Sequence, residues 1–193
     1  MIGKTKKEKL KAFTLVETVV SIALFGFISV ILVNIFVSAL RTQTRILQNQ
    51  ELMEQSSYSL EYMTRFLRMA KKDVDGSCTG TPNANYGVGT NAITFLAYDT
   101  NAAEYRCRRF LKDGDVIKEM RSTDTTSGNL GTAQAITSSK IKINGLIFGV
   151  TGNVVPDTVQ PKVTVMVDIK SSDLAGSPEI FIQSSVSQRD LDI

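Results

Sequence analysis

The chain has 193 residues, of which 42% are hydrophobic and 21% are charged, and its formal net charge is +3 at pH 7. This length and composition fit one ordinary globular domain with an added anchor. The chain contains no histidine, which excludes His-based catalytic triads and histidine metal sites.

The first 12 residues are basic. They contain five lysines and one acid, Glu8, whereas the rest of the chain holds slightly more acidic than basic residues. A lysine cluster placed before an apolar segment keeps the N-terminus in the cytoplasm and directs the C-terminus outward. The basic excess therefore indicates membrane orientation, and no nucleic-acid partner is implied.

An apolar segment follows, with no charged residue from Thr18 to Leu40. As a helix it would be about 34 Å long, enough to cross a bilayer core of about 30 Å. A cleaved secretory signal would have a shorter apolar core followed by a small-residue cleavage site, but this run is too long and nothing like A-x-A follows it. We expect residues 13–40 to span the membrane; a plain signal anchor is the alternative, but it does not explain the acid at Glu17.

The segment Lys11-Ala-Phe-Thr-Leu-Val-Glu17 resembles the prepilin cleavage motif of type IV pilins and type II secretion pseudopilins. In that family a basic leader ends in a small residue, usually glycine and sometimes alanine, and Phe with a T-L-[IVL]-E stretch follows. The resemblance implies that residues 1–12 are a leader peptide. It also implies that prepilin peptidase, a membrane aspartic peptidase, cuts between Ala12 and Phe13 and methylates the new Phe13 amine.

Glu17 is the candidate assembly residue. An ionised acid in an apolar helix costs about 2.5–3.5 kcal/mol on insertion scales, so it usually has a partner. After cleavage the Phe13 amine would be a cation at a similar depth, and a pair at about 4 Å is worth roughly 4 kcal/mol at an effective dielectric near 20. Within one subunit the amine and the acid are one turn apart, so an intramolecular pair is possible; the resemblance implies that the amine of an incoming subunit meets the acid of its neighbour. The alternative is an acid favoured by the helix dipole and reaching toward the interface.

Residues 41–72 are expected to continue the helix beyond the membrane as an amphipathic half. Apolar residues recur there every seven positions, with two more placed three residues later, and form one stripe. The stripe consists of Ile46, Met53, Leu60, Met63, Leu67 and Ala70. We expect it to pack against a head domain rather than form a coiled coil, because the repeat is short.

Residues 73–193 are expected to form that head domain. Their composition predicts loops at 73–91 and 122–139. β-Branched and aromatic residues predict strands at 92–99, 104–111, 116–121, 140–150, 162–170 and 179–187. Asp113-Gly114 predicts a hairpin turn between two of them. The fold class is therefore α+β: a long N-terminal helix, transmembrane in its first half, and an antiparallel β-sheet head laid against its second half, pilin-like in layout.

The head also resembles the J-type pseudopilins and W-type minor pilins. The resemblance rests on a helix ending LEYMTRFLRMA, a Tyr-Arg hairpin with an Asp-Gly turn, and a final strand ending Ser187-Gln-Arg189. In those relatives the subunit lies at or near the filament tip and helps to start assembly. A major pilin is the alternative subclass.

Cys78 and Cys107 both lie beyond the membrane segment, in what would be an oxidising compartment where pairing is favoured. Closing a loop of about 30 residues would stabilise the fold by roughly 3–4 kcal/mol in the entropic account. Two unpaired thiols are the alternative. Asp73, Asp75 and Gly76 are spaced like the start of a calcium loop, but the later ligands are missing, so no metal and no other cofactor is expected.

These features predict a structural subunit and not an enzyme, because no nucleophile elbow and no phosphate-binding glycine loop occurs. The predicted partners are prepilin peptidase, other pilin or pseudopilin subunits, an inner-membrane assembly platform and the membrane itself. The predicted location is the cytoplasmic membrane, with the head outside, and then a pilus or pseudopilus. The alternative is an uncleaved, single-pass, membrane-anchored binding module.

Overall fold

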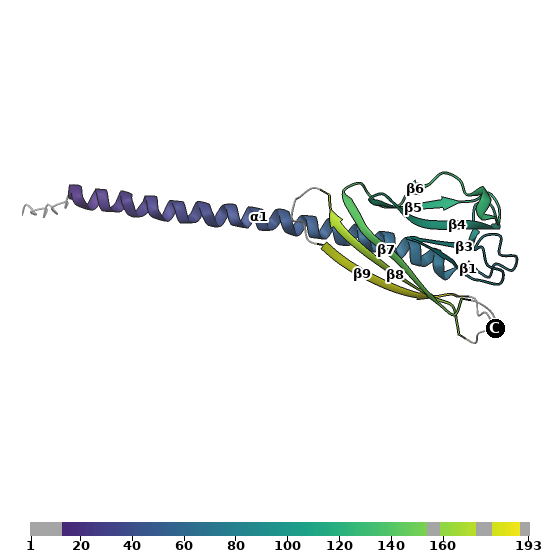
Figure 1. Cartoon of the computed structure of the whole chain (residues 1–193). Helices are drawn as coiled ribbons and strands as arrows, with labels where there is room; N and C mark the ends of the chain where they lie inside the picture. Colours follow the sequence, from purple (N-terminus) through teal and green to yellow (C-terminus); the bar gives the residue numbers. More distant parts are fainter. Residues whose placement is uncertain (1–12, 154–158, 173–178, 190–193) are drawn as a thin grey trace, which may run out of the picture. The chain divides into compact units, whose positions relative to one another are not determined.

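A computed structural model describes residues 13–153, 159–172 and 179–189 (Figure 1). The predicted leader, with Ala12, lies outside the described residues. The chain divides into two compact units, residues 1–47 and 48–193. One long N-terminal helix is followed by antiparallel sheets, so the predicted α+β fold class is confirmed.

Helix α1 extends from Leu15 to Arg68. The helix was expected to reach residue 72, and this expectation is wrong at its end, because Ala70–Lys71 form strand β1, which pairs with β3. Tertiary donors bind the last carbonyls of the helix: the Tyr86 hydroxyl donates to the Leu67 carbonyl at 2.7 Å and the Arg189 amide to the Arg68 carbonyl at 2.8 Å. These bonds satisfy groups that the end of a helix leaves unpaired.

The buried face of α1 differs in part from the predicted stripe. Leu60, Met63 and Leu67 are buried as expected, but Ile46 and Met53 are 49% and 54% exposed. The full set of buried helix residues is Leu52, Ser56, Ser59, Leu60, Met63 and Leu67. A straight helix of 3.6 residues per turn drifts by about 20° per heptad, so a strict seven-residue series does not stay on one face.

The first sheet follows the helix in the chain. Its strands are β1, β2 (Gly87–Gly89), β3 (Ala92–Asp99), β4 (Glu104–Asp113), β5 (Val116–Arg121) and β6 (Gln134–Ala135). They pair antiparallel in the order β1-β3-β4-β5-β6, and β2 also pairs with β3. The turn between β4 and β5 is confirmed, since Gly114 has a φ of +61°, which tight hairpins favour. The two predicted loops also contain short elements: β2, β6 and the 3-10 turn Ser127–Asn129.

The second sheet consists of β7 (Ile141–Thr151), β8 (Lys162–Ser171) and β9 (Glu179–Ser187). The sequence indicated a single sheet, whereas the described residues form two. β6 pairs with β5 at the end of the first sheet, and β7 contacts β3, β4 and β5 while its ladder is made with β8. Residues 163, 165, 167 and 169 of β8 are all buried, as their alternation predicts.

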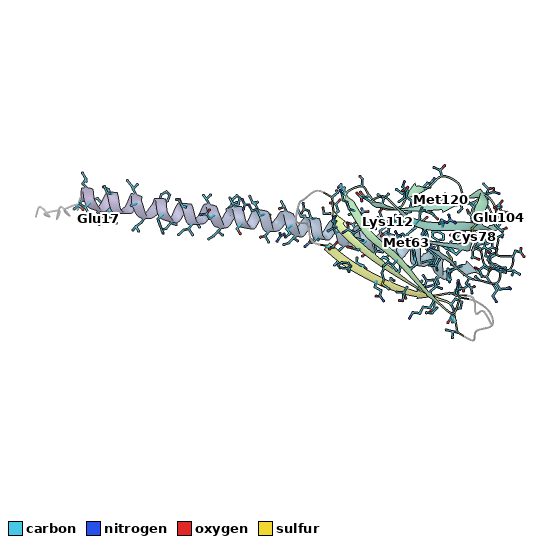
Figure 2. All side chains as sticks on the ribbon, in the orientation of Figure 1. Glu17, Met63, Cys78, Glu104, Lys112 and Met120 are labelled. Carbon is cyan, nitrogen blue, oxygen red and sulfur yellow. A yellow bond between two sulfur atoms is a disulfide. The ribbon has the colours of Figure 1, made fainter. Side chains whose placement is uncertain are left out.

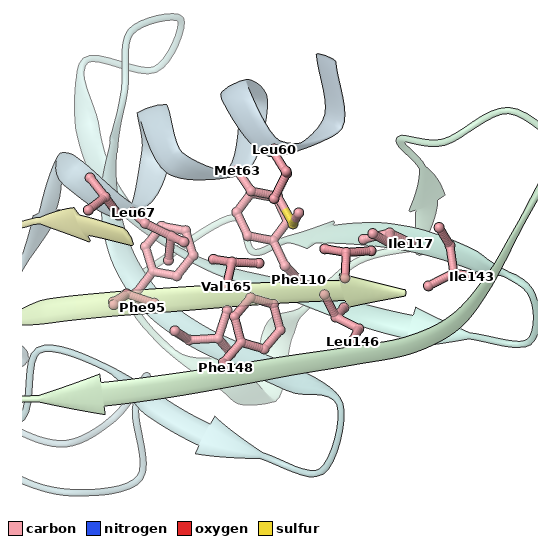
Figure 3. Close-up of a cluster of buried hydrophobic side chains, with 14 of the residues drawn as sticks. Leu60, Met63, Leu67, Phe95, Phe110, Ile117, Ile143, Leu146, Phe148 and Val165 are labelled. Atoms are coloured by element: carbon pink, nitrogen blue, oxygen red, sulfur yellow. The ribbon is translucent and has the colours of Figure 1, made fainter. Parts of the chain in front are cut away.

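Both sheets and the helix share one hydrophobic core (Figure 3). Leu60, Met63 and Leu67 of α1 meet Phe95, Phe110 and Ile117 of the first sheet and Leu146, Phe148 and Val165 of the second. Most of these side chains are completely inaccessible to solvent. The second half of α1 is therefore part of the head unit and is held there by apolar packing.

Candidate functional site

The candidate processing and assembly site lies at the N-terminal end of α1. Phe13 precedes the helix and is 74% exposed. The Thr14 hydroxyl oxygen accepts a hydrogen bond from the Glu17 amide at 3.3 Å, so Thr14 caps the helix. Thr14 and Glu17 have the spacing of a capping box. The sequence-based interpretation missed this cap, although the T-x-x-E pattern was a signal for it.

Glu17 lies in the first turn of α1, where the helix dipole favours an acid (Figure 2). Among the described residues no basic side chain forms an ion pair with it. Its main-chain carbonyl accepts a hydrogen bond from Ser21 at 2.7 Å, but this bond does not involve the carboxylate. The carboxylate of Glu17 is therefore available to a cation from outside the described part of the chain.

The helix that follows Glu17 is long and apolar enough to span a membrane. None of the side chains in its most apolar window is buried, and Phe25, Phe27 and Val30 are each more than 60% exposed. Large contiguous apolar patches of this kind are rare on soluble monomers. A single-pass membrane anchor is the arrangement that this helix fits.

Cys78 and Cys107 form a disulfide, with their Cα atoms 5.5 Å apart. It joins the segment after β1 to β4, and both cysteines are buried against Leu96. Asp73 supports the same segment, because its carboxylate accepts hydrogen bonds from the Cys78 and Thr79 amides at 2.9 and 2.8 Å and from the Thr79 hydroxyl. In the described residues no group of three or more acidic, cysteine or histidine side chains is arranged to hold a metal ion.

A polar cluster of Tyr62, Arg108, Glu119 and Arg121 joins the helix to the first sheet. Glu119 is 3% exposed and accepts hydrogen bonds of 2.8 Å from Arg108, Arg121 and the Tyr62 hydroxyl. Arg108 is itself 3% exposed, and its guanidinium carbon lies 4.1 Å from the centre of the Phe66 ring. The sequence-based interpretation missed this cluster.

The charges of the cluster are mutually stabilised. Burial raises the pKa of Tyr62, and the hydrogen bond to Glu119 raises it further. The same carboxylate raises the pKa of Arg121. Next to the cluster, a hydrogen bond from the Asn101 amide lowers the pKa of Asp99, and Arg108, 3.8 Å away, lowers it further. Glu119 thus accepts hydrogen bonds from three donors at once, and one of them, Tyr62, belongs to the helix.

No protein-family model, no curated protein and no solved structure matches the chain. Any statement on its family therefore depends on the residues of the chain itself, at the N-terminus and in the head. Of the predicted site residues, the structure describes Phe13 and Glu17, one turn apart at the start of α1, and the two bonded cysteines, which belong to the head unit.

Proposed function

We propose that the chain is a prepilin-type structural subunit, a minor pilin or pseudopilin, which is cut before Phe13 and assembled into a type IV pilus-like or type II secretion filament. The observation that carries the proposal is Glu17, an acid without a described ion-pair partner in the first turn of an exposed apolar helix. An acid at such a position is costly unless a cation reaches it.

Proteolysis would supply that cation. Hydrolysis of the bond between Ala12 and Phe13 releases the leader and leaves a protonated α-amine on Phe13, and methylation keeps it cationic. An amine of a neighbouring subunit brought to about 4 Å from Glu17 would contribute roughly 4 kcal/mol at an effective dielectric near 20. The uncut chain has an uncharged amide at this position and cannot form the ion pair. Cleavage would therefore be required before assembly.

The proposed location follows from the same parts. The lysines of the leader would remain in the cytoplasm, and the head would fold outside, where a disulfide such as Cys78–Cys107 persists. The proposed partners are prepilin peptidase, the inner-membrane assembly platform and other pilin or pseudopilin subunits. The buried polar cluster and the shared core would make the head a rigid body carried by its helix.

The test compares three variants of the full chain in cells that assemble the filament. Glu17→Ala and Glu17→Gln both remove the charge, and Thr14→Val removes the cap bond alone. We expect all three to be cut normally, as read by intact mass, and only the two Glu17 variants to be lost from sheared filaments. Normal incorporation of Glu17→Gln would refute the electrostatic role, and loss of Thr14→Val alone would assign the effect to capping.

Mass spectrometry of the wild-type chain decides between this proposal and the anchored binding module. A mature chain that begins with methylated Phe13 supports the filament subunit. A chain that retains Met1 and its lysines in a cell with active prepilin peptidase would instead make the helix a permanent tether.

A further inference from the structure

Within the apolar half of α1, most hydroxyl groups form hydrogen bonds with their own helix. Thr18 donates to the Leu15 carbonyl at 2.8 Å, and Ser21 donates to the Glu17 carbonyl at 2.7 Å. Ser29 donates to the Phe25 carbonyl at 2.8 Å. Such bonds let a hydroxyl enter a membrane without a partner from another helix.

Asn34 and Ser38 differ from these residues. In the described part of the chain neither side chain forms a hydrogen bond. They are four residues apart and thus lie on the same face of the helix. Together with Ile31, Ile35 and Ala39 they line a shallow groove along α1.

The depth of Asn34 makes its carboxamide costly. It is six residues from Leu40, the nearer end of the uncharged run, or about 9 Å along the helix. An asparagine side chain is too short to reach the interface from there, unlike the long stem of a lysine. In hydrocarbon an amide without partners carries its full desolvation cost, so we expect another polar group to meet it at the same depth.

A second copy of the chain provides that group. All copies of a single-pass protein insert in the same direction, so Asn34 of one copy lies at the depth of Asn34 of the next. A carboxamide both donates and accepts, and two can therefore bond to each other across a symmetric contact. Ser38 and Ala39 are small and let two helices approach closely.

We propose that the Asn34–Ser38 face is the contact of a parallel homodimer formed in the membrane. The dimer requires only membrane insertion and is independent of cleavage, so it is a state of the pool from which any filament would be built. Asn34 fixes the register of the two helices, in the way that one buried asparagine fixes the register of a coiled coil.

Cysteine crosslinking of the full chain in native membranes tests the proposal. The two natural cysteines are bonded to each other, so a single introduced thiol reports on the helix. Thr42 lines the groove, so Thr42→Cys places a thiol on the proposed contact face. Leu40, two residues away, lies about 160° around the helix, so Leu40→Cys places a thiol on the opposite side. We expect a crosslinked dimer with Thr42→Cys, and about threefold to tenfold less with Leu40→Cys or when Asn34→Leu is added to Thr42→Cys.

Two controls make the result specific. Ser29→Ala removes a hydroxyl that is already bonded to its own helix and should leave the Thr42→Cys crosslink unchanged, whereas Asn34→Gln retains the amide and should preserve part of it. The dimer should persist in cells without prepilin peptidase, which separates this proposal from the filament proposal. Equal crosslinking at the two positions, no effect of Asn34→Leu, or a product whose mass includes a different protein would overturn it.

Discussion

Removing the carboxylate of Glu119 should strongly destabilise the head unit. The substitution Glu119→Ala takes away the acceptor of three hydrogen bonds, from Arg108, Arg121 and Tyr62. It also leaves the Arg108 guanidinium buried, with a side chain that is 4% exposed. Water can reach Arg121, whose side chain is 43% exposed, but it cannot readily reach Arg108.

The expected cost is about 3 kcal/mol. Removing one partner of a buried ion pair costs about 3–5 kcal/mol, because the other charge remains without compensation. The lower end of that range applies here, since Asp99 remains 3.8 Å from Arg108 and the Phe66 ring faces its guanidinium. Tyr62→Phe removes only one hydroxyl, and about 1 kcal/mol is expected from that change.

The assay is urea unfolding of the full chain in detergent micelles. The near-ultraviolet circular dichroism of its tyrosines monitors the transition. The chain has no tryptophan, and Tyr86, which is 1% exposed in the core, reports on packing of the head unit. The midpoint should fall while the denaturant slope stays constant. If the near-ultraviolet spectrum of the variant in micelles without urea has the same shape as that of the wild type, the variant still folds.

A matched pair of variants tests the electrostatic argument itself. Arg108→Met combined with Glu119→Leu removes both buried charges, and the double variant should lose clearly less stability than the sum of the two single changes. The reasoning is refuted if Glu119→Ala costs less than about 1 kcal/mol, or if the double variant shows simple additivity.

Three further predictions concern the head unit. Replacing Cys78 and Cys107 by alanine together should lower the free energy of unfolding by about 3–4 kcal/mol, since the bond closes a loop with a sequence separation of 29; an equal change on reducing the wild type would support this. Met63→Ala should cost about 2–5 kcal/mol at a fully buried site, whereas Met53→Ala at a 54% exposed site should stay within about 0.5 kcal/mol. Asp99 has a lowered pKa, so in acid the unfolded chain binds more protons than the folded chain. The free energy that ionised Asp99 contributes to stability is therefore present above pH 3.8 and declines below it. Asp99→Asn should flatten the dependence of the free energy of unfolding on pH in that acidic range.

The strands were the most predictable part of the fold. The predicted segments 92–99, 116–121 and 179–187 coincide with β3, β5 and β9, and the other three differ by at most two residues at an end. Alternating apolar residues define a strand locally. The grouping of strands into two sheets depends on contacts between distant segments, and no local pattern carries that information.

The end of the helix shows the same limit. Residues 69–72 are compatible with a helix by composition, yet Ala70–Lys71 pair with β3. The competing interaction is tertiary, because Gln188 donates to the Ala70 carbonyl at 2.6 Å from the far end of the chain. Propensity is a weak guide where a sheet edge offers backbone partners.

The placement of Glu17 in the first turn of an apolar helix could be predicted because the residues involved are adjacent in the sequence: the uncharged run follows Glu17 directly. The polar cluster could not be predicted, because Tyr62 and Glu119 are 57 positions apart. A weak signal did exist, since Glu119 lies two residues after the buried Ile117 and so shares its face of β5.

That inward-facing acid also constrains how the head can assemble. A slip of β5 by one residue would turn Glu119 outward and Met120 inward, and Arg108 would lose its 2.8 Å partner in the interior. An apolar residue at 119 would penalise such a slip less, because several apolar side chains can fill the same space. The cluster therefore favours one register of β5 against β4, whose paired residues include Arg108 and Arg121. Since Tyr62 of α1 bonds to the same carboxylate, this register also fixes the face that the helix turns toward the sheet.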